Sequence, residues 1–140
     1  LLIIAEGNFN MNIYDNEQNL LAVLIDTKKN NDTKNFYTSN DLDIQVASFN
    51  LSSQDVIERH FHYSQNRNIK TTSEVIYLQS GKIEVEIYDI NKKFVQNVLV
   101  KEEMLIILLQ GGHAINILED SKFIEVKQGP YDPENDKERF

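Results

Sequence analysis

The chain contains three histidines, His60, His62 and His113, and the carboxylate of Glu74 lies between them in the sequence. His60 and His62 are two residues apart in a run typical of a β-strand, and side chains at this spacing point to the same face of a strand. Imidazole is a common ligand of first-row transition metals, and a third imidazole with a carboxylate would complete a mixed nitrogen and oxygen site. Two ordinary surface histidines would show the same spacing, but the whole set predicts one divalent metal ion held by these four side chains.

Strands must position these side chains, because strand patterns dominate the chain and helical periodicity is scarce. About nine short strands are expected, at residues 20–25, 44–49, 56–62, 74–78, 82–88, 94–100, 104–109, 113–118 and 122–127. Turns are expected at residues 79–82 and 89–93, and a short helical turn capped by Asp132 near the C-terminus. No long amphipathic segment separates the strands, which excludes alternating βα units and predicts an all-β barrel or sandwich.

The candidate ligands resemble the two metal-binding motifs of the cupin superfamily. The matching residues are His60-Phe61-His62, Glu74, Gly81 after six intervening residues, Gly112-His113 and Asn116. The resemblance implies a cupin double-stranded β-helix, a jelly-roll barrel, with the metal held by the three histidines and Glu74. The eleven residues between His62 and Glu74 exceed the three or four of the common pattern, so a longer loop is expected at the barrel mouth. Glu74 would then either bind the ion directly or support the histidine ligands without touching the ion.

The C-terminal residues 125–131, Asp136-Lys137 and Phe140 are similar to those of small cupins found among sugar-nucleotide and surface-glycan biosynthesis proteins. This resemblance implies a small carbohydrate-like or sugar-nucleotide substrate, and isomerase or epimerase chemistry is our hypothesis for the reaction. The ligand set would suit Fe, Mn, Ni, Zn or Cu as the bound divalent ion. Some relatives with this barrel use histidines as bases without a metal, so that variant stays open. A non-catalytic binding module and an Fe(II)-dependent dioxygenase are the alternatives, and whether the protein is an enzyme is left open. The tail around Gly129-Pro130-Tyr131 either packs as a turn, lines the pocket or forms a dimer contact.

Two carboxylates are candidate catalytic residues. Glu74 would move a proton. Glu58, two residues before His60, would act as a base or orient a histidine through a hydrogen bond. Tyr63, Arg67 and Lys70 lie in the long loop and are candidate substrate-binding residues. Arg67 or Lys70 could hold a phosphate or carboxylate, although each would equally well be a solvated loop charge.

Composition limits the partners. The net charge of −8 disfavours nucleic acid, and no apolar run approaches the roughly 20 residues of a membrane helix. Absence of cysteine excludes thiolate chemistry and fits the cytoplasm. The expected partners are a small molecule and a second copy, with residues 20–25 as the candidate edge of a homodimer. Residues 11–140 are expected to form one cupin domain, and residues 1–10, which precede the first methionine, a non-native or flexible extension.

Overall fold

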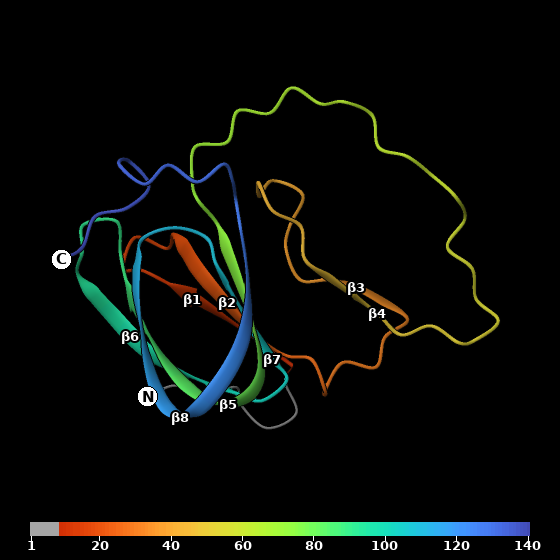
Figure 1. The fold of residues 1–140 in the computed structure, drawn as a ribbon, viewed down its shortest axis with the longest axis horizontal. Coiled ribbons are helices and arrows are strands. Elements are labelled where there is room, and N and C mark those ends of the chain that lie inside the picture. Colours follow the sequence, from red (N-terminus) through yellow and green to blue (C-terminus); the bar gives the residue numbers. More distant parts are fainter. Residues whose placement is uncertain (1–8) are drawn as a thin grey trace.

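The computed structural model describes residues 9–140, and within them all regular secondary structure is β-strand (Figure 1). The strands are β1 (Asn10–Tyr14), β2 (Leu20–Asp26), β3 (Lys34–Phe36), β4 (Ala47–Phe49), β5 (Glu74–Tyr88), β6 (Phe94–Lys101), β7 (Met104–Leu108) and β8 (Gly112–Lys127). Six of them form one antiparallel sheet in the order β1-β2-β7-β5-β6, with β8 paired to β5. The remaining two, β3 and β4, form a small hairpin. The large sheet curls strongly into a half-barrel, which agrees with the all-β prediction.

The large sheet buries side chains on both faces because its strands alternate. Inside the curl, Leu24, Ile76 and Ile106 are fully buried in one cluster with residues of β5, β6 and β7. On the outer face, Val23 and Ile107 are buried under residues 37–46 of the β3–β4 hairpin. β2 is therefore covered on both sides, which explains its continuous apolar run. β2 also lies between β1 and β7, so the prediction that residues 20–25 form a dimer edge is wrong.

β5 and β8 are longer than the sequence predicted. The expected turn at residues 79–82 is absent, and β5 continues through it with shifts in its register against β8. Gly81 takes a φ of +93° in the middle of this stretch, a conformation that glycine adopts without steric cost. The same bend runs through β8, where residues 113–118 and 122–127 form one strand. Gly81 therefore bends the strand where the sequence suggested a chain reversal.

Residues 51–72 form a long excursion that we call the arm. The strand predicted at residues 56–62 is wrong, because the arm holds no strand and its side chains are exposed apart from the half-buried Ile69. Figure 1 shows the arm (yellow to green) looping out beyond the β3–β4 hairpin, away from the sheet. An extended segment becomes a strand only when a neighbour supplies the ladder of hydrogen bonds, and no described residue does so here.

Strands at 20–25, 94–100 and 104–109 are confirmed to within one or two residues, and the turn at 89–93 is closed by the Asp89 carboxylate. The sequence patterns did not predict β1 or β3. The C-terminal helical turn is absent; the Asp132 carboxylate instead accepts hydrogen bonds from the backbone N–H groups of Glu134 and Asn135 in a simple turn.

The N-terminal extension was predicted for residues 1–10. Residues 1–8 lie outside the described part of the chain, and Asn10 begins β1, paired with Ile25. Within residues 9–140 there is no helix of the length and apolarity that a bilayer crossing requires.

Candidate functional site

The curl of β5 and β8 brings Glu74 and His113 together. Glu74 begins β5 opposite Lys127, whereas His113 lies near the start of β8 opposite Ile87. Thirteen residues of straight strand would separate these positions by about 43 Å. Because both strands bend, the Nε2 atom of His113 lies 3.1 Å from the Oε2 atom of Glu74. The fold thus joins two residues from opposite ends of one strand pair.

Both side chains belong to the inner face of the half-barrel. Glu74 alternates with Val75, so it shares its face with the fully buried Ile76 and Leu78. His113 likewise shares a face with Ile115, which packs against the same inner cluster. Ile76, Leu78 and Ile115 therefore lie on the same face of the sheet as the Glu74–His113 pair.

Contact with His113 lowers the pKa of the Glu74 carboxyl group. The hydrogen bond from His113 holds the pKa of Glu74 below its usual value of 4.5, and the nearby positive charges of His113 and Lys127 act in the same direction. Partial burial opposes this effect by penalising the charged form. Glu74 is mostly covered, with a side chain 14% exposed, and His113 is more open at 30%. The arrangement favours an ionised carboxylate with an accessible imidazole beside it.

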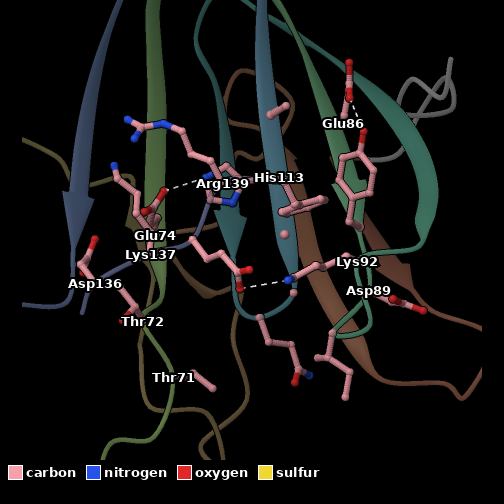
Figure 2. A pocket seen from close by; sticks show the side chains of 18 of the residues that line it. Thr71, Thr72, Glu74, Glu86, Asp89, Lys92, His113, Asp136, Lys137 and Arg139 are labelled. Atoms are coloured by element: carbon pink, nitrogen blue, oxygen red, sulfur yellow. Dashed lines mark hydrogen bonds and ion pairs between the residues drawn. The ribbon is translucent and has the colours of Figure 1, made fainter. Parts of the chain in front are cut away.

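A cavity of about 980 Å³ adjoins this pair (Figure 2). Its walls come from β5, β8, the turn after β5 and the C-terminal tail, and they include Thr71, Thr72, Glu86, Tyr88, Asp89, Lys92, Gly112, Glu125, Lys127 and residues 136–140. Phe140 is one of these lining residues, and its ring lies 5.2 Å from that of Tyr88 in an edge-to-face contact. Residues 136–140 therefore line the cavity, whereas Gly129, Pro130 and Tyr131, which the sequence offered as a candidate pocket lining, do not.

Residues 136–140 supply cations that were not predicted from the sequence. Lys137 and Arg139 line the cavity, and no ion pair is formed by either among the described residues. Lys92 and Lys127 also line it but are paired, at 2.9 Å to Glu138 and 3.7 Å to Asp136. The sequence signal was weak, because a charged C-terminus is usually a solvated end. Two cationic side chains are therefore available to an anionic ligand in this cavity.

The HxH histidines lie elsewhere. His60 and His62 are both in the exposed arm, with ring centroids 5.3 Å apart, and the Nδ1 atom of His60 is 2.8 Å from the backbone oxygen of Glu58. The structure thus brings the predicted ligands together as two separate pairs, one on the sheet and one in the arm. Among residues 9–140 no group of three or more His, Cys, Asp or Glu side chains is placed to hold a metal ion.

The remaining predicted site residues follow the arm. The side chains of Glu58, Tyr63, Arg67 and Lys70 are exposed and do not line the cavity. Thr71 and Thr72, at the end of the arm, do line it. Of the site residues predicted from the sequence, Glu74 and His113 are therefore the two that line the cavity.

These two groups can work in two ways. A carboxylate oxygen and an imidazole nitrogen are both ligands for transition metals. A carboxylate in contact with an imidazole can also serve as an acid–base pair that moves a proton. Comparisons of this chain with protein-family models, with curated proteins and with solved structures found no match in any of the three.

Proposed function

We propose that this protein is a metal-binding cupin that holds one divalent transition metal ion with Glu74 and His113, and that His60 and His62 complete the ligand set. The contact between Glu74 and His113 supports the proposal best. Two neighbouring ligand atoms of an octahedral ion, each about 2.1 Å from the metal, lie about 3 Å apart. The 3.1 Å between the His113 and Glu74 atoms matches that spacing.

The length of the arm supports the second pair of ligands. Eleven residues separate His62 from Glu74, and an extended chain spans at most about 3.3–3.6 Å per residue. His62 can therefore lie up to about 40 Å from Glu74. A loop of this length can also fold back, so that His62 reaches the cavity beside Glu74. The two histidines are already neighbours in the arm, so one movement would deliver both.

The cavity chemistry suits a small anionic carbohydrate. A metal with open coordination positions binds paired hydroxyl or carbonyl oxygens and polarises a carbonyl. Lys137 and Arg139 would hold a phosphate or carboxylate of the same substrate. Isomerase or epimerase chemistry would follow, in which a proton leaves the carbon beside the carbonyl and returns either to the other face of that carbon or to the neighbouring carbon.

A second candidate function needs no metal. The hydrogen bond between Glu74 and His113 orients the imidazole, as an acid–base pair requires. His113 would then be the base of a sugar ketoisomerase or epimerase. The two candidates share the substrate class. They differ in the role of Glu74 and His113, which are metal ligands in the first and an acid–base pair in the second, and in whether His60 and His62 bind a metal.

Cobalt(II) titration followed by visible absorption tests the metal proposal. Wild-type protein, purified without a metal-affinity tag, is expected to bind one Co(II) per chain with ligand-field bands of a nitrogen and oxygen site. Glu74→Gln, His113→Ala and the double variant His60→Ala/His62→Ala should each lose those bands. Glu84→Gln is the matched control, because Glu84 is on the opposite face of the same strand.

The outcomes separate the two candidates. Full Co(II) binding by the His60→Ala/His62→Ala variant would contradict the four-ligand proposal. No Co(II) binding by wild type, together with turnover of a sugar nucleotide that His113→Ala abolishes, would establish the metal-free alternative. Glu84→Gln should behave as wild type in both assays.

A further inference from the structure

The outer edge of β8 is open. This strand has 16 residues and, in the described part of the chain, pairs with β5 alone. Large apolar side chains are exposed along it, with Ile117 at 56%, Leu118 at 48%, Ile124 at 49% and Val126 at 59%. A long, unpaired and apolar strand edge is a template for another strand, and folded proteins rarely leave one uncovered.

The arm has the complementary property. Between residues 56 and 72 it makes no backbone hydrogen bond to the rest of the described chain. It exposes Val56 at 80%, Ile57 at 63%, Phe61 at 75% and Tyr63 at 75%. An extended segment with large apolar side chains and unpaired backbone groups is suited to adding to a sheet edge.

We propose that the arm of one copy adds as a strand to the β8 edge of a second copy, and that the exchange is reciprocal. The start of the arm is fixed to its own hairpin, because Asn50 donates a side-chain hydrogen bond to the backbone oxygen of Asp32 at 2.8 Å. From there the arm leaves its own sheet (Figure 1). Reciprocal exchange around a two-fold axis covers both arms and both β8 edges with one contact used twice.

Charge agrees with one register of the exchanged strand. Every strand pair in this fold is antiparallel, and the antiparallel register with His62 opposite His113 places Arg59 opposite Asn116. The Asn116 amide donates to Glu84 at 3.4 Å and to Glu86 at 2.8 Å, and neither carboxylate has an ion-pair partner among residues 9–140. Arg59 would supply that partner.

The apolar side chains agree with the same register. Ile57 falls opposite Leu118, and Phe61 falls opposite the small Ala114. The arm also carries the opposite charge to the protein as a whole, since Arg59, Arg67 and Lys70 outnumber Asp55 and Glu58 in a chain of net charge −8. Attraction between the arm and a second copy therefore acts at a distance as well as at contact.

This register has a consequence for the metal site. His62 and His60 would point to the inner face, beside His113 and Glu74 of the second copy, because residues directly opposite in a ladder share a face. Each site would then contain ligands from two chains. This part of the inference depends on the proposed metal-binding function, whereas the exchange itself does not.

A double cysteine variant tests the exchange. The chain has no cysteine, so Phe61→Cys/Ala114→Cys introduces the sole thiols, and residues directly opposite in a ladder are close enough for a disulfide. Mild oxidation should give a covalent dimer on non-reducing gels. A monomer with an internal disulfide would overturn the inference in favour of the arm closing on its own chain, and absence of any disulfide would overturn it outright. Phe61→Cys/Asn91→Cys, with the second thiol on an exposed turn, is the matched control and should not form the dimer.

Co-expression of two defective chains tests the shared site. His62→Ala and His113→Ala chains, carrying different non-histidine tags, are purified as a heterodimer. The arm of the His113→Ala chain and the sheet of the His62→Ala chain together restore one complete site, so one Co(II) per heterodimer is expected, against two per wild-type dimer and none in either variant alone. No ion in the heterodimer, with two in the wild-type dimer, would show that each site is built within one chain. Failure of wild type to bind any ion, with the disulfide dimer formed, would remove the metal function and leave the exchange standing.

Discussion

Replacing Gly81 by alanine should destabilise the fold more than a single exposed glycine normally does. Gly81 has a φ of +93°, and a Cβ atom added there would lie 2.3 Å from the backbone oxygen of Asp120 and 2.8 Å from the Cα atom of Ser121. The left-handed backbone costs an alanine about 1–2 kcal/mol, and overpacking typically adds about 1–3 kcal/mol. The expected loss in the free energy of unfolding is therefore about 2–5 kcal/mol, a large share of the roughly 5–15 kcal/mol of an ordinary domain.

Urea unfolding followed by circular dichroism measures this loss. Gly129→Ala is the matched control, because a Cβ atom added at Gly129 meets nothing within 4 Å. Ordinary surface substitutions change the free energy of unfolding by at most about 0.5 kcal/mol. A change no larger than that for Gly81→Ala would contradict the steric role assigned to Gly81. Since the bend at Gly81 lets β5 and β8 curl, the variant should also weaken the contact between Glu74 and His113, measured as weaker binding of Co(II).

Three further predictions concern the core, the pH dependence and the ligand. Ile106→Ala should cost about 2–5 kcal/mol in urea unfolding because Ile106 is fully buried, whereas Ile90→Ala, at a position 61% exposed, should cost little; equal losses would contradict the assignment of the core. The Asn19 amide holds the pKa of Asp15 below its usual 3.8, so the stabilisation is complete above pH 3.8 and is lost as the pH falls through the folded-state pKa. Asp15→Asn should therefore lower the melting temperature at pH 7, with a difference that narrows from pH 4 toward pH 2; a difference independent of pH would contradict this account. Arg139→Gln should weaken binding of a sugar nucleotide about tenfold in calorimetry without changing the melting temperature, and unchanged affinity would exclude Arg139 as an anion ligand.

The sequence predicted local strand patterns well and long-range geometry poorly. Alternation at residues 82–88 located part of β5 correctly, because one buried face is enough to produce it. The bend at Gly81 was interpreted as a turn, because a glycine between two strand patterns fits either a reversal or a kink. Strand character at residues 56–62 predicted a strand, but pairing requires a neighbour, and local pattern does not say whether one is present in the same chain.

The candidate site was predicted in the same uneven way. Glu74 and His113 were chosen from motif and residue type, and their contact depends on a curl of β5 and β8 that no periodicity encodes. Lys137 and Arg139 were missed, because a short charged tail carries no signal for its place in the fold. Residue chemistry thus identified candidates, and the bent strand pair determined which of them meet.

Metal analysis of the untagged native protein is the most direct test of the proposed function. Inductively coupled plasma mass spectrometry of wild-type protein, beside the His60→Ala/His62→Ala variant and the Glu84→Gln control, gives the ions bound per chain. The account predicts close to one transition-metal ion per chain in wild type and control, and far less in the double variant. Wild-type protein with much less than one ion per chain, and with a melting temperature unchanged by a chelator, would contradict it.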